Sequence, residues 1–104
     1  MAVKNIDAKQ YEELILGSKP VLVDFWAPWC TYCRRIEPAL NKLAETREDV
    51  LIVKVNIDEE PELAWRERVE VIPTLVLYQD GYDLGSIVAP DSRSTIEQFL
   101  AESL

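Results

Sequence analysis

The sequence VLVDFWAPWCTYC, residues 21–33, decides the fold of this chain. It begins as an apolar, β-branched run that is typical of a buried strand, and it is interrupted at Pro28. It then places both cysteines of the chain, Cys30 and Cys33, at the start of a predicted helix. A strand that leads into Cys-x-x-Cys at a helix start is typical of a redox-active cysteine pair. The stretch therefore predicts thiol chemistry at the point where a strand meets a helix.

Hydrophobic periodicity and turn signals divide the rest of the chain into strands and helices. Two buried strands joined by a helix favour a right-handed parallel unit, and a terminal hairpin adds antiparallel strands. The prediction is an α/β fold with a mixed central sheet flanked by helices on both faces (β-α-β-α-β-α-β-β-α). Its elements are an edge strand at 3–6, a helix capped by Asp7 with Gln10, a strand at 21–26, a helix from 30 or 31 to 46 with a kink at Pro38, a strand at 50–55, a short helix from Pro61, a strand at 74–78, a turn at 79–81, a strand at 85–88, and a last helix capped by Asp91 or Ser92.

The length and composition indicate one globular domain, residues 1–104. Hydrophobic residues make up 48% and charged residues 29%, as in ordinary globular proteins. The net charge is −8, from 11 basic and 19 acidic residues, which disfavours nucleic acid and anionic membrane surfaces as partners. No apolar stretch approaches the roughly 20 residues that span a bilayer, and residues 1–10 lack the pattern of a signal peptide. We therefore expect a cytoplasmic protein, and in that reducing compartment a close cysteine pair favours a reactive site.

The position of the two cysteines predicts different roles for them. A thiolate is the nucleophile in thiol–disulfide exchange, and the unpaired N–H groups and dipole of a helix start favour the anion. Cys30 is therefore the predicted nucleophile, and Cys33, lying deeper, is the predicted resolving thiol. A static disulfide or inert pair is the alternative, which the helix start and the neighbouring Trp29 argue against. We predict no metal site, because structural zinc usually needs four Cys or His ligands and the chain has no His.

Several motifs together resemble the thioredoxin family over essentially the whole chain. They are Asp24-Phe25-Trp26-Ala27, Trp29-Cys30-x-x-Cys33, Pro38, Lys54 within a strand, and Ile72-Pro73-Thr74. The resemblance implies the thioredoxin fold and a protein-disulfide oxidoreductase that uses no cofactor other than its redox-active Cys30–Cys33 disulfide. It also implies disulfide-containing protein substrates and a thioredoxin reductase as electron donor, and we expect a monomer.

The resemblance also assigns roles to individual residues. Pro73 is expected to be cis and to expose the backbone of Ile72 to an extended substrate, whereas the pattern alone would make it a strand-start proline. Asp24 is expected to be a buried carboxylate behind Cys33 with a raised pKa, which exchanges a proton with that thiol, and Lys54 would partly offset its desolvation. The alternative places Asp24 at an edge facing water.

The remaining aromatic residues and the departures from the family pattern concern the surface around the cysteines. Trp29, Thr31, Tyr32 and Ala89 join Ile72 and Pro73 as predicted substrate-binding residues, Trp26 is expected under the cysteine loop, and Trp65 is expected in core or helix packing. Thr31-Tyr32 stands where thioredoxins usually have Gly-Pro, and a tyrosine before the second cysteine is similar to glutaredoxins. Ala89 and Val71 stand where the family usually has glycine or another small residue. Glu67 replaces a usual aromatic residue, and the sequence offers no physical account of that change.

Three other functions remain open from the sequence. A glutathione-coupled oxidoreductase would use Arg34 and Arg35 to bind the carboxylates of glutathione, and a disulfide isomerase would use the same cysteines at a different reduction potential. A redox-switched binding module is the non-enzymatic alternative. In one version of this alternative, two copies of the chain would bind one iron–sulfur cluster between them through Cys30 and Cys33 of each copy.

Overall fold

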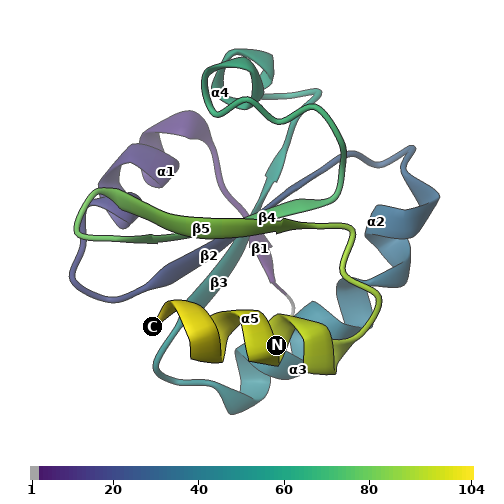
Figure 1. Ribbon diagram of the computed structural model, residues 1–104. Coiled ribbons are helices and arrows are strands. Elements are labelled where there is room, and N and C mark those ends of the chain that lie inside the picture. Colours follow the sequence, from purple (N-terminus) through teal and green to yellow (C-terminus); the bar gives the residue numbers. More distant parts are fainter. Residues whose placement is uncertain (1–2) are drawn as a thin grey trace.

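The computed structural model describes residues 3–104, which form a five-stranded sheet with helices on both faces (Figure 1). The strands follow the order β1-β3-β2-β4-β5, with β2 at the centre of the sheet. β1 and β2 run parallel to β3, whereas β4 pairs antiparallel with β2 and β5 antiparallel with β4. The mixed sheet predicted from the sequence is therefore confirmed. The strands are β1 (Lys4–Asn5), β2 (Val21–Trp26), β3 (Leu51–Asn56), β4 (Thr74–Gln79) and β5 (Tyr82–Val88).

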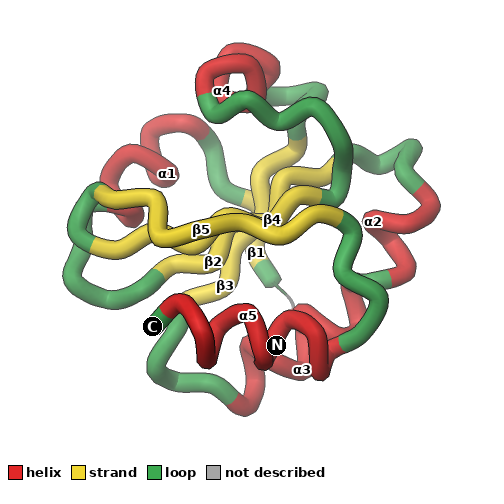
Figure 2. Tube along the Cα trace, viewed as in Figure 1, coloured by secondary structure: helices red, strands yellow, loops and turns green. Residues whose placement is uncertain are grey.

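The helices form two layers, one on each side of the sheet (Figure 2). One buried cluster joins α3 and α5 to the sheet through side chains such as Leu40 and Leu100, which pack with Leu22 of β2. The other joins α1 and α4 to the opposite face, where Tyr11 and Leu63 pack with β2 and its neighbours. The sheet is thus covered on both faces. The helices are α1 (Ala8–Ile15), α2 (Thr31–Arg35), α3 (Glu37–Thr46), α4 (Pro61–Arg66) and α5 (Arg93–Ser103).

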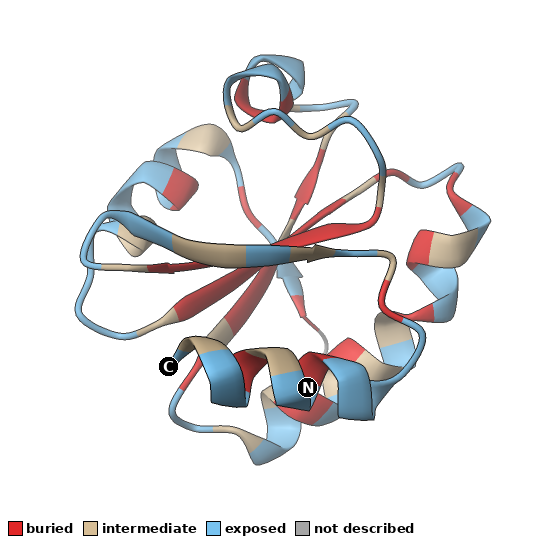
Figure 3. Ribbon diagram, viewed as in Figure 1, coloured by how far each residue is buried: buried red, intermediate tan, exposed pale blue. Residues whose placement is uncertain are grey.

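Strand β2 is buried on both faces, which explains why its apolar residues do not alternate with polar ones (Figure 3). Side chains alternate between the two faces of a strand. Val23 belongs to the cluster under α1 and α4, whereas Leu22 belongs to the cluster under α3 and α5. Asp24 is two residues from Leu22 and therefore lies on the α3/α5 face.

The helix expected from residue 30 or 31 to 46 is divided into α2 and α3 at Ile36. Pro38 has no N–H to donate to the carbonyl four residues earlier, so one continuous helix would lose that hydrogen bond. Ile36 instead serves as the C-cap of α2 and the N-cap of α3, and its carbonyl accepts a hydrogen bond from the Leu40 N–H at 3.1 Å. The predicted kink is thus an interruption, and it gives the cysteines a short helix of their own.

Local signals placed most of the other boundaries correctly. Asp7 and Gln10 form the predicted capping box of α1, and Ser92 is the N-cap of α5. The turn between β4 and β5 is tight, with positive φ angles at Asp80 (54°) and Gly81 (83°), and β5 begins at Tyr82, three residues earlier than predicted. None of the helices in residues 3–104 is both long and apolar enough to cross a membrane.

The prediction for Trp65 is wrong. Its side chain is 86% exposed on α4 and takes no part in core packing. The apolar contribution of this short helix comes from Leu63 and Ala64, which are buried against the sheet. A helix of two turns has room for only one buried stripe, and Trp65 lies outside it.

Candidate active site

The two cysteines are joined in a disulfide at the start of α2. Cys30 is the N-cap residue and Cys33 lies in the first turn, with their Cα atoms 5.3 Å apart. Cys30 is 9% exposed and Cys33 is 1% exposed, so Cys33 is the deeper of the two, as predicted. The Cys33 N–H donates a hydrogen bond to the Cys30 Sγ at 3.1 Å. A donor aimed at this sulfur would stabilise negative charge on it in the reduced protein.

Both apolar packing and hydrogen bonds hold the loop between β2 and α2. Ala27 is buried, and its carbonyl accepts a hydrogen bond from the Cys30 N–H at 3.1 Å. Trp26 packs against the cysteine cluster, as predicted, and its Nε1 donates to Asn5 Oδ1 at 2.8 Å. Trp29 is 67% exposed and its Nε1 donates to Asp58 Oδ2 at 3.0 Å. Trp29 therefore stands at the surface beside the disulfide in a fixed orientation.

The segment before β4 lies against the first cysteine. The Ile72-Pro73 peptide bond is cis, and the Ile72 carbonyl oxygen is 3.9 Å from the Cys30 Sγ. The Thr74 hydroxyl donates to the Val71 carbonyl, and the Val71 side chain is exposed. The structure thus brings Ile72 and Pro73, more than 40 residues from Cys30 in sequence, to the edge of the disulfide.

The segment that follows β5 completes this surface. Ala89 has a positive φ of 46°, and its N–H donates to the Pro73 carbonyl at 2.8 Å. The Tyr32 hydroxyl donates to the carbonyls of Ala89 and Pro90, at 3.3 and 3.2 Å. Thr31 is exposed at the start of α2. Of the six predicted substrate-binding residues, Tyr32, Ile72, Pro73 and Ala89 are joined by these contacts, and Trp29 and Thr31 lie on the cysteine loop and helix.

Asp24 is a buried carboxylate on the α3/α5 face of β2. Its side chain is 1% exposed, and neither carboxylate oxygen has a hydrogen-bond partner among the described protein groups. Burial raises the pKa of Asp24 to about 7, because desolvation disfavours the charged form; the Lys54 ammonium lowers this pKa and the Glu37 carboxylate raises it. The alternative that Asp24 faces water at an edge is wrong.

Lys54 lies beside Asp24 in the register of β2 and β3. Its Nζ is 3.5 Å from Glu37 Oε1 and 4.4 Å from the centre of the Trp26 ring. The Lys54 ammonium therefore interacts with two carboxylates, those of Asp24 and Glu37, and with the Trp26 ring. Glu37 was not predicted from the sequence. The one signal for it is its place directly before Pro38, which fixes it in the first turn of α3.

Glu67 stands at a position where an aromatic residue was expected from the family resemblance, and its hydrogen bonds account for the change. Glu67 Oε1 accepts hydrogen bonds from the hydroxyls of Tyr11, at 2.7 Å, and Tyr78, at 2.5 Å. Both tyrosines are buried, and burial raises the pKa of each above its ordinary range, so both hydroxyls stay protonated as donors. These three residues, the tyrosine–glutamate cluster, join α1, α4 and β4 on the face of the sheet opposite Asp24.

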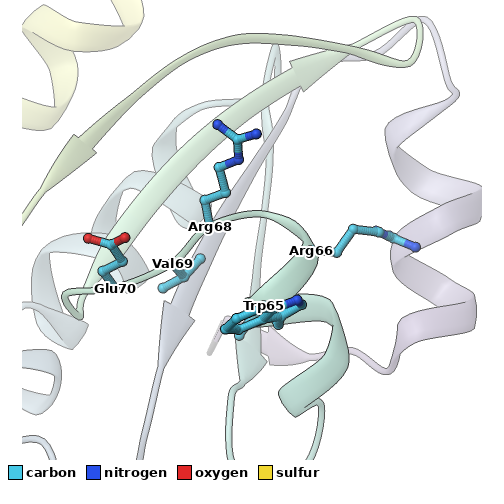
Figure 4. Close-up of a pocket in the computed structure, with 6 residues that line it drawn as sticks. Trp65, Arg66, Arg68, Val69 and Glu70 are labelled. Carbon is cyan, nitrogen blue, oxygen red and sulfur yellow. The ribbon is translucent and has the colours of Figure 1, made fainter.

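A pocket of about 630 Å³ lies beside α4 (Figure 4). Arg66 extends from it toward α1, where it pairs with Glu12, and Trp65 leaves the helix in another direction. The residues that line it include none of the predicted site residues: they are Ala64, Trp65, Arg66, Arg68, Val69 and Glu70. Within residues 3–104, no group of three or more Cys, His, Asp or Glu side chains is arranged to hold a metal ion.

Comparisons with known proteins agree with this site. The thioredoxin family profile matches residues 2–102. The chain is 39% identical over 99 residues to thioredoxin 1 of Synechococcus elongatus, covering 94% of this chain and 92% of that protein. It is 33% identical over 103 residues to the bifunctional thioredoxin reductase/thioredoxin of Mycobacterium leprae, covering 98% of this chain and 22% of that protein.

The fold is similar to that of solved thioredoxins. The crystal structure of Malassezia sympodialis thioredoxin superposes with a TM-score of 0.88 at 28% sequence identity, covering 98% of this chain and 90% of the other. The profile match, the sequence relatives and the cysteine pair at the start of α2 all lead to one conclusion. The chain belongs to the thioredoxin family and is a thiol–disulfide oxidoreductase.

Proposed function

We propose that the protein reduces disulfide bonds in other proteins, with Cys30 as the attacking thiol and Cys33 as the resolving thiol. The observation that carries this assignment is the difference between the two sulfurs. Cys30 is the more exposed residue, and its Sγ accepts the Cys33 N–H and lies next to the Ile72 carbonyl. Cys33 is almost fully buried beneath it. An incoming disulfide therefore meets Cys30 first.

The exchange proceeds in two steps. In the first, the Cys30 thiolate attacks one sulfur of the substrate disulfide, a mixed disulfide forms, and the other substrate sulfur leaves as a thiolate and takes up a proton. In the second, Cys33 loses its proton and attacks the Cys30 Sγ, the mixed disulfide breaks, and the second substrate thiol leaves. Two electrons pass from the dithiol to the substrate. The Cys30–Cys33 disulfide of the structure is the product state of this sequence.

In this proposal Asp24 receives the proton of Cys33 and returns it to the departing substrate thiol. A general base works best when its pKa lies near the operating pH, and burial brings the pKa of Asp24 to about 7. Lys54 acts through Asp24, because its ammonium favours the carboxylate form. In this proposal a water molecule carries the proton between Asp24 and Cys33, and the Asp24 oxygens, which have no protein partner among the described residues, would bind that water.

The substrate is proposed to bind as an extended segment across Ile72, Pro73 and Ala89, flanked by Trp29, Thr31 and Tyr32. Backbone pairing with an extended chain supplies affinity with little demand on sequence. Exposed Trp29, held by Asp58, adds an apolar contact beside Cys30. Arg34 and Arg35, the residues considered for glutathione, are exposed, and the Arg35 guanidinium lies over the Tyr32 ring at 5.7 Å.

A flavoprotein thioredoxin reductase is the proposed electron donor, acting on a monomer in the cytoplasm. The relative in which a thioredoxin reductase and a thioredoxin share one chain supports this pairing. The net charge of −8 supports protein partners over nucleic acids or anionic membrane surfaces.

Trapping of the mixed disulfide tests the roles of the cysteines. The Cys33→Ser variant should form a stable covalent complex with a protein disulfide such as that of insulin, because the second step is removed. The Cys30→Ser variant, the matched control, should form none. Capture by Cys30→Ser alone would reverse the assignment. A parallel assay with NADPH and either thioredoxin reductase or glutathione plus glutathione reductase distinguishes the two electron donors.

A further inference from the structure

Two departures from the family pattern, Tyr32 and Ala89, contact each other directly. The Tyr32 hydroxyl donates to the Ala89 carbonyl at 3.3 Å and to the Pro90 carbonyl at 3.2 Å. The residues lie 57 positions apart in sequence. We propose that Tyr32 is a positioning residue that holds segment 89–90 in place for protein substrates. This inference rests on the proposed binding of substrate across Ile72, Pro73 and Ala89.

Ala89 needs such support because of its backbone conformation. Its φ of +46° lies in the left-handed region, where a Cβ is crowded and where glycine is favoured. A non-glycine residue stays there only when its surroundings fix it. Two hydrogen bonds do so here, on opposite sides of the residue: the Ala89 N–H donates to the Pro73 carbonyl at 2.8 Å, and the Ala89 carbonyl accepts from Tyr32.

Tyr32 is well placed to act as the fixed end of this tether. Its ring is partly buried and packs against both the cysteine cluster and the main cluster under α3 and α5. The Arg35 guanidinium covers the ring at 5.7 Å. The hydroxyl therefore reaches segment 89–90 from a ring that is held by packing. The result is a closed frame around Cys30, running from α2 through Tyr32 to segment 89–90 and on to Pro73 and Ile72.

The frame has a consequence that depends on the kind of substrate. An extended protein segment that pairs with Ile72 and Ala89 binds best when segment 89–90 is already ordered, because ordering it on binding lowers the affinity. A small disulfide that reaches only the Cys30 sulfur has no such requirement. Loss of the Tyr32 hydroxyl should therefore weaken binding of protein disulfides more than that of small ones.

The first test is Tyr32→Phe, which removes the hydroxyl and keeps the ring. The ratio of KM for a protein disulfide to KM for a small aromatic disulfide should rise about 3- to 10-fold, with the larger part of the change in KM rather than kcat. Hydrogen exchange of the Ala89 amide should become at least about 5-fold faster, because the segment opens more often. The control is Tyr82→Phe, which removes an exposed hydroxyl from β5. An unchanged ratio together with unchanged amide exchange would overturn the proposal.

The second test asks whether the tether acts through the conformation of Ala89. Glycine adopts the left-handed conformation without crowding, so Ala89→Gly reduces the need for the tether. Tyr32→Phe should then change the KM ratio by less than about 2-fold in the Ala89→Gly background. An equal effect in both backgrounds would show that Tyr32 acts by another route and would reject the inference. Failure of the unaltered protein to reduce any protein disulfide would instead reject the proposed function.

Discussion

At the scale of single residues, burial raises the pKa of Asp24, and two neighbours of opposite charge adjust it. The Lys54 ammonium favours its carboxylate and the Glu37 carboxylate disfavours it, while Lys54 and Glu37 also pair with each other at 3.5 Å. Lys54 comes from the next strand of the sheet, and Glu37 comes from the helix that follows the cysteines. The environment of the buried acid is therefore set jointly by the sheet and by the break between α2 and α3.

Substitution of these two neighbours should move the pKa of Asp24 in opposite directions. Lys54→Met removes the cation and should raise the pKa above about 7, whereas Glu37→Gln removes the anion and should lower it. Carboxyl carbon NMR of the labelled, oxidised protein across pH 4 to 9 measures both shifts directly. Movement in the same direction in both variants would mean that changes in packing dominate over charge.

The spacing of Cys30 and Cys33 at a predicted helix start indicated the cysteine pair directly. The proposed site roles of Asp24 and Pro73, including the cis bond, came from the family resemblance. Glu37 could not be found, since a glutamate beside a proline on a helix is common and nothing local indicates a partner on another strand.

At the scale of elements, the hydrogen bonds of the tyrosine–glutamate cluster connect α1 and α4 to the sheet. Glu67, the C-cap residue of α4, accepts from Tyr11 of α1 and Tyr78 of β4. The rings of Tyr11 and Tyr78 also meet edge to face, with centroids 5.5 Å apart. A carboxylate that serves two buried hydroxyls replaces the packing that an aromatic residue would supply at this position.

Removal of the shared acceptor should destabilise the protein more than a change in its charge. Glu67→Leu removes the acceptor that both buried hydroxyls share and should lower the free energy of unfolding by about 2–4 kcal/mol. Glu67→Gln keeps a carbonyl oxygen as acceptor and should cost about 1 kcal/mol or less. Denaturant titrations at pH 7 compare the two. Equal losses in both variants would show that the charge, and not the hydrogen bonds, matters.

The elements themselves were largely predictable, and the exceptions have local causes. The bounds of β2 and the caps of α1 and α5 followed from residues next to each other in sequence. The start of β5 was missed because Tyr82 and Asp83 pair with β4 beyond a register shift that skips Leu84, and the pattern of a regular strand does not reveal this shift. The orientation of Trp65 depends on which stripe of a very short helix meets the sheet.

At the scale of the whole molecule, the buried Asp24 links folding to pH. Its pKa is about 7 in the folded protein and close to 3.9 in an unfolded chain. Through Asp24 the folded state therefore binds more protons between pH 4 and pH 7, so the contribution of Asp24 to stability falls as the pH rises through this range and levels off above it. A difference of about three pKa units corresponds to roughly 4 kcal/mol.

Asp24→Asn should remove this dependence. The oxidised variant should exceed the unaltered protein in stability by about 2–4 kcal/mol at pH 8, and the two should be nearly equal at pH 4. Guanidinium unfolding followed by circular dichroism at several pH values gives the difference curve. A difference that does not change with pH would mean that Asp24 has the same pKa in the folded and unfolded states.

β5 is an edge strand of the sheet. Its edge makes the solubility of the protein depend on pH in the opposite sense to the contribution of Asp24 to folding stability. Its outer backbone groups are open to another chain, and such borders seed aggregation. Asp83 Oδ1 accepts a hydrogen bond from the Gly85 N–H at 2.8 Å, and mutual repulsion at a net charge of −8 opposes association between copies at pH 7. Near the sequence pI of about 4.5 that repulsion disappears. Acid that strengthens the contribution of Asp24 to folding thus weakens the colloidal stability of the solution.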